Sequence, residues 1–349
     1  AAGFSDAVNF RNIIINGDMS IAQRSTSVSG ITGTDSGYKT LDRFYTEISS
    51  AGTWTQSQST DVPSGQGFAK SFKMDCTTAT ASPTFLSVDT YFEGQNLQYL
   101  KKGTSSAKSL TLSFWVKSSK TGTHVTELRD HDNNRTISRT YTISSANTWE
   151  KKELTFVGDT TGAFANDNGR SLDARFFLAV SSTYSSGTLA TSWESRTNAN
   201  RAVGQVNLAD STANEWYITG VQLEAGTSAS EFEFLPVDVN LRRCLRYYTQ
   251  VTQNHYFAGA RANGTTGLIG GRFYTSVPLR AGPTIDAGTY QYYYGDAGNG
   301  SVSSSTTAVE YQRDNTGLSF RLNSALSGVV DNEPVIVVAN STIGYDSEL

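Results

Sequence analysis

Apolar and polar residues alternate along most of this 349-residue chain with a period of two, which is the pattern of a β-strand with one buried face. Residues 110–117 show it most clearly, because every second side chain is a large apolar one. The same alternation marks residues 153–157, 171–180 and 216–223. Clusters of Asn, Asp and Gly separate these runs, with hardly a helical pattern between them. We therefore predict an all-β chain built on an antiparallel sandwich of the jelly-roll kind.

One short segment follows a helical period instead. Leu241, Cys244, Leu245 and Tyr248 stand at positions i, i+3, i+4 and i+7, soon after Pro236. This spacing predicts a short amphipathic helix, with Cys244 as a small apolar residue on its buried face rather than a reactive thiol. Beyond it the strand pattern returns at residues 268–277, 290–294, 308–312, 318–322 and 334–339.

The position of this helix divides the chain into two β domains. We predict a jelly-roll β-sandwich over residues 1–236, a helical linker over 237–250 and a smaller C-terminal β-sandwich over 251–349. The chain begins with Ala1 and Ala2, without an initiator Met or a signal-peptide pattern. We interpret it as a processed chain or as the C-terminal part of a longer one.

Composition excludes several classes of function. With 28 Lys+Arg against 32 Asp+Glu the net charge is −4, and basic residues do not cluster, so no nucleic-acid partner is expected. No apolar run approaches the ~20 residues of a membrane-spanning helix, so no membrane insertion is expected. Aromatic residues make up 11% of the chain, which is too many for a disordered polar segment. The two cysteines, Cys76 and Cys244, form neither a disulfide framework nor a CxxC motif.

One motif raises serine hydrolysis as an alternative. The run from Gly17 to Ser20 resembles the Gly-Asp-Ser block of lipase-like hydrolases, which need a His base that follows an Asp by three positions. None of the three histidines has an Asp at that position, and Met19 separates the acid from the serine. We therefore predict a tight turn here, after a first strand at residues 12–16.

Paired carboxylates would be the groups needed to cleave a polysaccharide. Candidates on strands or at strand ends are Glu47, Asp89, Glu93, Glu127, Asp173, Glu215 and Glu224. Catalysis needs two of them about 5–9.5 Å apart, which one sequence does not show, and a chain of this length carries many surface acids. We expect no catalytic residue and no enzyme, with a polysaccharide depolymerase that uses an Asp/Glu pair as the alternative.

An acidic turn at residues 130–133 offers oxygen ligands of the kind that Ca²⁺ prefers. The turn lacks the regular ligand spacing of a known calcium loop, so an Asx-rich hairpin turn is the preferred interpretation, and a structural calcium stays open. Three histidines leave little material for a zinc site. No cofactor is expected.

Some aromatic residues fall on the polar faces of the predicted strands. Trp115 and Phe177 do so, and so does Trp216, because alternate residues from Tyr217 to Leu223 are predicted to point inward. A flat ring beside hydroxyl, amide and charged groups suits the apolar face and the rim hydroxyls of a pyranose. The alternative is that such a strand is covered on both faces, by a second layer or a neighbouring subunit. For Trp115 we expect that it is covered.

Tyrosines form a second set of candidate ligand-binding residues. Tyr290, Tyr292, Tyr293 and Tyr294 cluster in one predicted strand, and Tyr247 lies at the end of the predicted helix. A tyrosine carries a large flat surface with a polar tip at a low cost in conformational entropy. We predict that these five residues contact a glycan.

Seven motifs occur in a fixed order between residues 12 and 248. They are NIIINGDMSIAQR at 12–24, LDRFY at 41–45, SFWVKS at 113–118, NTWEKK at 147–152, WYITGVQLEAG at 216–226, FEFLP at 232–236 and CLRYY at 244–248. Their order and spacing resemble the tail-fibre or receptor-binding proteins of tailed bacteriophages, with a jelly roll similar to carbohydrate-binding modules. Residues 274–284 also resemble the start of the small β domain that often ends such proteins.

This resemblance implies a homotrimeric virion protein, made in the host cytoplasm without disulfides and located in the phage tail or another surface appendage. It implies attachment to a polysaccharide or other glycan of the host cell surface, and contacts with other virion proteins. A trimer would also account for strands that are apolar on both faces, as at Phe176 and Phe177. The alternative is a structural adaptor of the tail, collar or capsid that binds no glycan.

Overall fold

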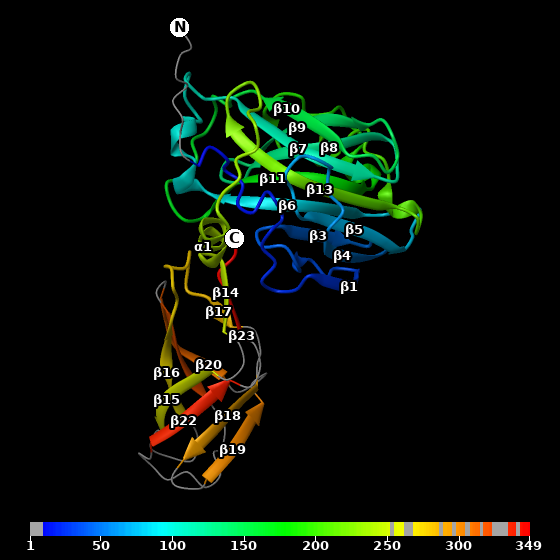
Figure 1. The fold of residues 1–349 in the computed structure, drawn as a ribbon. Helices are drawn as coiled ribbons and strands as arrows, with labels where there is room; N and C mark the ends of the chain where they lie inside the picture. The colour runs from blue at the N-terminus through cyan, green and yellow to red at the C-terminus, as the bar shows by residue number, and fades with distance from the viewer. Residues whose placement is uncertain are drawn as a thin grey trace. The chain divides into compact units, whose positions relative to one another are not determined.

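The computed structural model describes residues 10–251, 255–261, 268–285, 289–294, 298–303, 308–314, 317–322, 334–339 and 343–349. As predicted, these residues form antiparallel β-sheets with one short α-helix (Figure 1). The chain forms two compact units, residues 1–240 and residues 241–348.

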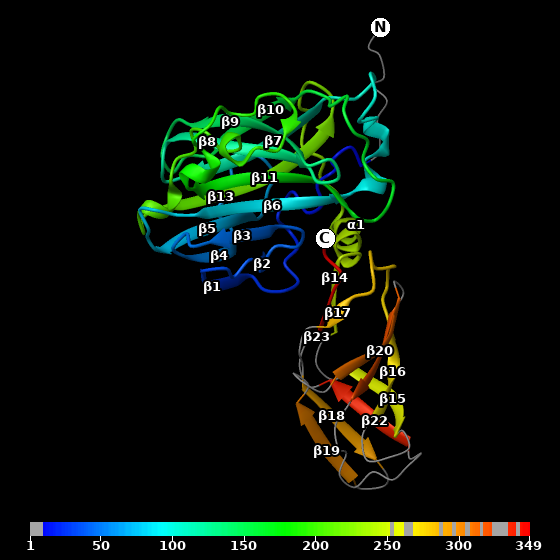
Figure 2. The same cartoon turned by 180° about the vertical axis from the view of Figure 1, so that it is seen from behind.

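Two antiparallel sheets of the N-terminal unit lie face to face as a jelly-roll β-sandwich (Figure 2). The first sheet has six strands, in the order β1 (Ser27–Thr32), β4 (Thr53–Ser59), β5 (Ser71–Thr78), β13 (Glu215–Ala225), β7 (Leu110–Ser118) and β10 (Glu150–Phe156). The second sheet has seven, in the order β12 (Glu194–Ser195), β9 (Arg135–Ile143), β8 (Gly122–Asp130), β11 (Arg170–Val180), β6 (Phe85–Glu93), β3 (Tyr45–Ser49) and β2 (Gly37–Tyr38). Short 3-10 helices lie in the connections, namely η1 (Gly94–Asn96), η2 (Gln98–Leu100), η3 (Ser182–Tyr184), η4 (Asn198–Asn200) and η5 (Leu208–Asp210).

The apolar core of this unit lies between the two sheets. Leu112 and Phe114 of β7 contribute from the first sheet, and Phe176 of β11 contributes from the second. The rings of Phe114 and Phe176 meet edge to face with their centroids 5.1 Å apart. The alternation predicted for residues 110–117 is therefore confirmed, and that of residues 171–180 is confirmed as far as Leu178. The register against β6 shifts after Phe177, so Ala179 lies in the core, and Val180, which was predicted to point inward, packs on the other face of β11. Each large side chain buried in this layer contributes about 1.5–3 kcal/mol.

Phe177 lies on the opposite face of β11 from the core and is nevertheless fully buried. It packs with Phe85, Val125 and Ala202 in a second apolar cluster, against which Tyr184 of η3 also rests. The cover of this face therefore comes from the chain's own connection between β11 and β13. A neighbouring subunit is not needed to explain why Phe177 is apolar.

The face predicted for the start of β13 is wrong. Trp216 and Ile218 point into the core, and Tyr217 points to the outer face. The register against β7 shifts between Thr219 and Gln222, which marks a β-bulge. One extra residue reverses the side-chain alternation, so that Val221 and Leu223 point inward as predicted while the residues before the bulge do the opposite.

Residues 12–16 do not form the predicted strand. Main-chain hydrogen bonds join Ile13 to Leu223 and Gly17 to Val221, so the segment lies along β13. The Asn12 side chain intervenes in this pairing, because its amide donates to the carbonyl of Val221 and its carbonyl accepts from the main-chain N–H of Leu223. The pairing is therefore irregular. The turn predicted for residues 17–20 follows it.

Helix α1 (Val237–Leu245) confirms the predicted short helix, and Cys244 on it is fully buried as expected. No helix in the described part of the chain has the length and hydropathy needed to cross a bilayer. The C-terminal unit contains a three-stranded sheet of β14 (Tyr248–Val251), β23 (Ile343–Asp346) and β17 (Thr284–Ile285). Its second sheet has seven strands, in the order β19 (Gly298–Ser303), β18 (Thr289–Tyr294), β22 (Pro334–Ala339), β15 (His255–Arg261), β16 (Leu268–Tyr274), β21 (Gly317–Leu322) and β20 (Ala308–Asp314).

Candidate functional site

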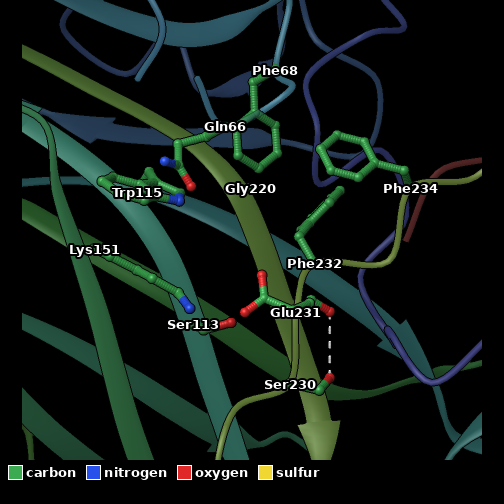
Figure 3. Close-up of a pocket in the computed structure, with 10 residues that line it drawn as sticks. All are labelled: Gln66, Phe68, Ser113, Trp115, Lys151, Gly220, Ser230, Glu231, Phe232 and Phe234. Atoms are coloured by element: carbon green, nitrogen blue, oxygen red, sulfur yellow. Dashed lines mark hydrogen bonds between the residues drawn. The ribbon is translucent and has the colours of Figure 1, made fainter. Parts of the chain in front are cut away.

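A cavity of about 240 Å³ lies on the outer face of the first sheet of the N-terminal unit (Figure 3). It is lined by Gln66, Phe68, Ser113, Trp115, Lys151, Gly220, Ser230, Glu231, Phe232 and Phe234. Four of these are aromatic, and five carry a polar or charged side chain that can form a hydrogen bond with a ligand. A predominantly apolar surface with a few polar groups is the usual composition of a small-molecule site.

Trp115 lies on the strand at the centre of this cavity. It sits in the middle of β7, between Lys151 of β10 and Thr219 of β13. Trp115 is half-buried, whereas all the remaining residues of β7 are buried. The chain's own described residues therefore do not cover Trp115 with a second layer, because the strands beside it present Lys and Thr. Cover by a neighbouring subunit stays a prediction.

The bulge in β13 allows an aromatic wall to form beside Trp115. Gly220 has a φ of +61°, and a Cβ at that position would lie 2.5 Å from Cζ of Phe68. The Phe68 ring therefore rests directly against the backbone of the bulge. Around it, the ring centroids of Phe232 and Phe234 lie 5.1 and 5.0 Å from that of Phe68. These three rings form the phenylalanine cluster of the cavity.

Side chains of β13 hold the second wall, residues 230–233, in place. The Ser230 hydroxyl donates to Glu224 Oε2 at 2.7 Å, and its main-chain N–H donates to Glu224 Oε1 at 2.8 Å. The main-chain N–H of Glu233 donates to Gln222 Oε1 at 2.9 Å. Gln222 and Glu224 follow the bulge, so the same insertion that makes room for Phe68 also sets the direction of these two anchoring side chains.

Polar groups converge on one side of the cavity. The Lys151 amine, the Ser113 hydroxyl and the Glu231 carboxylate point toward the same space (Figure 3). Together they provide a cationic donor, a hydroxyl and an anionic acceptor around the Trp115 ring. Such a set can bind several hydroxyl groups of one ligand at once, because hydroxyls both donate and accept.

A second aromatic group continues the same face along β7. Lys117 forms an ion pair with Asp61 and lies 4.1 Å from the ring centroid of Tyr217. The Trp149 indole N–H donates to Asp61 Oδ1 at 2.9 Å. Burial acts to raise the pKa of Asp61, but the hydrogen bonds from Lys117 and Trp149 outweigh it, so the pKa lies below its ordinary value. Asp61 therefore holds Trp149 and Lys117 in fixed positions at neutral pH.

None of the five tyrosines predicted to bind a glycan lines this cavity. Tyr290, Tyr292, Tyr293 and Tyr294 lie on strand β18, and their side chains are outside the described residues. Tyr247 is 2% exposed. Its ring is buried and offers no free face to a sugar, so it is not part of the surface proposed below.

The candidate carboxylates are mostly held by cations or amides. Three of them accept hydrogen bonds from arginines. Asp89 accepts from Arg175 Nη2 at 2.6 Å, and Glu127 accepts from Arg201 Nη2 at 2.7 Å. Asp173 accepts from Arg170 Nε at 2.5 Å. Glu47 shares Arg175 with Asp89, while Glu93 accepts from Gln95 and Glu215 accepts from Lys73. Burial raises the pKa of Asp89 to about 6, in the range of a general acid, but the side chain is fully buried and has no access to a substrate.

A lysine ammonium occupies the position next to the acidic turn considered for calcium. Lys102 Nζ lies 2.5 Å from Asp130 Oδ2 and 3.1 Å from Asp159 Oδ2, and it donates to the carbonyl of Gly162 at 2.7 Å. Asp130 also accepts two hydrogen bonds from Asn133, as in an Asx turn. Across the described residues, no three His, Cys, Asp or Glu side chains are grouped to hold a metal ion.

The serine of the lipase-like motif is held as a structural element. Ser20 Oγ donates to Asp18 Oδ1 at 3.1 Å and accepts from Asn240 Nδ2 at 3.0 Å. Asn240 also donates to Asp18 and accepts from the main-chain N–H of Asn16. The turn therefore ties residues 16–20 to helix α1, in agreement with the predicted turn.

The phenylalanine cluster was not predicted from the sequence. Phe232 and Phe234 are separated by one residue, which is the spacing of two side chains on one face of an extended segment. That signal was present, but Phe68 lies in a loop more than 160 residues earlier, so nothing local indicates that the three rings meet.

Comparisons with known proteins give only distant similarities. No family model and no curated protein matches the chain. The chain is similar to the enzymatically active domain of bacteriophage CBA120 tailspike protein 4, at 16% identity and a TM-score of 0.33, over 62% of this chain and 22% of that one. It is similar to the Family 11 carbohydrate-binding module of a Clostridium thermocellum cellulosomal cellulase, at 12% identity and a TM-score of 0.27, over 62% of this chain and 96% of that one. It is also similar to TmCBM61 in complex with β-1,4-galactotriose, at 11% identity and a TM-score of 0.25, over 62% and 99% of the two chains. With TM-scores below 0.5, these similarities carry no argument about function.

Proposed function

We propose that the N-terminal unit binds a glycan through the cavity around Trp115 and does not cleave it. The observation that carries the proposal is the half-buried Trp115 ring, set among Ser113, Lys151 and Glu231 on an otherwise buried strand. The C–H groups on one face of a pyranose can rest on such a ring while the hydroxyls at its rim reach the polar side chains.

The size of the cavity limits how much of a glycan it takes. Its volume of about 240 Å³ lies below the ~300–1,000 Å³ of sites that enclose a whole drug-sized ligand. A segment of a longer polymer, with one ring seated on Trp115 and its neighbours on the open face, fits this shape. Trp149 and Tyr217 extend the aromatic surface in the direction of β7, because Lys117 joins them to the strand that carries Trp115.

The biological role follows from the resemblance of the motifs to phage tail-fibre and receptor-binding proteins. We propose a virion subunit that attaches to host cell-surface polysaccharide as a homotrimer and contacts other virion proteins. Three weak sites on one particle bind with higher avidity than one site alone. A structural adaptor of the tail, collar or capsid is the alternative, and it would leave the cavity without a glycan.

Binding of the purified chain to extracted host polysaccharide tests this proposal, with the oligomeric state measured by light scattering. Trp115→Ala is expected to weaken binding at least tenfold. Tyr99→Ala removes another exposed aromatic ring outside the cavity and serves as the matched control. Equal binding by Trp115→Ala and the unmodified chain would contradict the proposal, and release of reducing ends would indicate a depolymerase.

The tyrosines of β18 stay a separate proposal for a second contact surface. Tyr292→Ala and Tyr294→Ala are expected to weaken host adsorption while the melting temperature stays nearly constant. A fall of many degrees would mean instead that these side chains are core or interface residues.

A further inference from the structure

The outer face of the second sheet carries a regular array of charged side chains. Strand register places Asp89, Arg175 and Glu127 side by side on β6, β11 and β8. Two residues along, it places Asp173 of β11 beside Arg129 of β8. The Trp115 cavity lies on the other sheet of the sandwich.

Three arginines of this face are satisfied by carboxylates. Arg175 donates to Asp89 at 2.6 and 3.0 Å, and Arg201 donates to both oxygens of Glu127 at 2.7 and 2.8 Å. Arg170 likewise donates to both oxygens of Asp173, at 2.5 and 2.6 Å. Each pair has the two-point geometry in which a guanidinium binds a carboxylate most strongly.

Two further arginines near this edge of the sheet lack such a partner. Strand register places Arg129 of β8 and Glu194 of β12 opposite Thr136 of β9, one on each side, and Arg196 follows Glu194 by two residues. The closest approach of Arg129 to a carboxylate is 3.9 Å, from Nη1 to Asp173 Oδ2, and that oxygen already accepts from Arg170 at 2.6 Å. For Arg196, no carboxylate oxygen of the described residues lies within ion-pair distance, and nearby Glu194 accepts from Asn200. The Nε atoms of both arginines are shielded from solvent and have no hydrogen-bond partner.

The surroundings of Arg129 and Arg196 disfavour their positive charges. Burial, together with the positive charges of Arg201 and Arg129, lowers the pKa of Arg196 to about 10. Burial also lowers the pKa of Arg129, and Arg175 and Arg170 add to this effect against the opposing charge of Asp173. Both side chains are half-buried, so part of each guanidinium still reaches the surface.

We propose that Arg129 and Arg196 form a binding site for an oxyanion, the carboxylate or sulfate group of an acidic saccharide. The flat guanidinium fork matches the two oxygens of such a group, and the anion would supply the negative charge that the neighbouring carboxylates do not. This site lies on a different sheet from the Trp115 cavity and does not depend on the proposed function of that cavity.

Calorimetric titration of the full chain tests the site with defined probes. These are a uronate oligosaccharide, a sulfated oligosaccharide, a neutral oligosaccharide of the same length, and inorganic sulfate and acetate. We expect the unmodified chain to bind an acidic oligosaccharide and the double variant Arg129→Gln/Arg196→Gln to bind it at least tenfold more weakly. Arg242→Gln, an exposed arginine of α1 subjected to the same change, is expected to leave binding unchanged. Trp115→Ala is expected to leave it unchanged as well, which separates this site from the cavity.

Stability provides the second readout. Because neither arginine has a carboxylate at hydrogen-bond distance, the double variant is expected to keep or raise the melting temperature, whereas Arg175→Gln is expected to lower it. No binding of either acidic oligosaccharide by the unmodified chain, or affinity within twofold for the double variant, would overturn the proposal. Inorganic sulfate or acetate that binds as tightly as the oligosaccharide would mean that the site takes a free anion, which would overturn the assignment to a saccharide.

Discussion

Gly220 and Phe68 are complementary across 150 residues of sequence, because the ring of Phe68 occupies the space where any other residue at 220 would place its Cβ. That Cβ would lie 2.5 Å from Cζ of Phe68. The glycine also has a φ of +61°, which other residues adopt at a cost. The bulge, the ring and the wall of the cavity therefore depend on one side chain being absent.

Gly220→Ala is expected to lower the free energy of unfolding by about 2–4 kcal/mol, since it combines backbone strain with a displaced Phe68 ring. Gly33→Ala is the matched control, because Gly33 has a φ of +62° but nothing near the position of a Cβ. It should cost only the backbone part, about 1 kcal/mol. Urea unfolding measures both, and equal costs for the two variants would show that the contact with Phe68 is not restrictive.

The two tryptophans on neighbouring strands should respond differently to truncation. Trp216 is fully buried in the core, so Trp216→Ala is expected to cost about 3–5 kcal/mol. Trp115 is half-buried at the cavity, so Trp115→Ala should cost less than about 2 kcal/mol. Midpoints of urea unfolding compare them. A cost for Trp115→Ala as large as that for Trp216→Ala would mean that its ring is covered in solution, as in a trimer.

Lys102 should be among the charged residues most important for stability. Lys102→Met would leave the buried Asp130 without a cation, while Asp159 would keep Arg135, at an expected cost of about 3–5 kcal/mol. Lys39→Met breaks the exposed pair with Asp35 and should cost less than about 1 kcal/mol. Thermal unfolding of both variants checks this contrast, which would fail if the two melting temperatures fell equally.

His124 should make the protein less stable in mild acid. Burial lowers the pKa of His124 to about 4, from an ordinary value of 6.5. Between these values the unfolded chain takes up a proton that the folded chain does not, so stability falls as the pH drops from 6.5 toward 4, by up to about 3 kcal/mol. His124→Phe is expected to reduce this slope, measured by urea unfolding across the same range.

Asp89 changes the pH dependence of stability in the opposite direction from His124. The slope for His124→Phe therefore has to be compared with the slope for the unmodified chain. Burial raises the pKa of Asp89 to about 6, so protonation of the folded state stabilises it as the pH falls. His131→Phe, at an exposed position, serves as the control and should change the slope less than His124→Phe. Identical slopes for the unmodified chain and His124→Phe would show that His124 is not kept neutral by burial.

Much of the fold could be predicted from local patterns. The alternation in residues 110–117 fixes which side chains of β7 point into the core, because successive side chains of a strand point to opposite faces. The spacing of Leu241, Cys244 and Leu245 likewise identifies helix α1, since these positions share one face of a helix. Both inferences depend only on backbone geometry within one element.

The same rule gave the wrong face at the start of β13. A bulge inserts one residue, so the alternation reverses at Gly220. A glycine inside a strand often marks a bulge, but residues 216–223 fit an uninterrupted strand as well. The core then selects Trp216 over Tyr217, since the indole packs against Phe176 with ring centroids 6.0 Å apart. Packing against the opposite sheet therefore decides which of these two side chains points into the core.

The sequence by itself determined the antiparallel strands, the short helix, the buried Cys244 and the lack of a lipase-like base, because each depends on residues that are close along the chain. Only the tertiary structure decided that Trp115 lies open beside Phe68, Phe232 and Phe234, and that Arg129 and Arg196 lack the carboxylates given to their neighbours. These relationships join residues far apart in sequence, and they depend on strand order and on the bulge, which long-range packing of the two sheets sets.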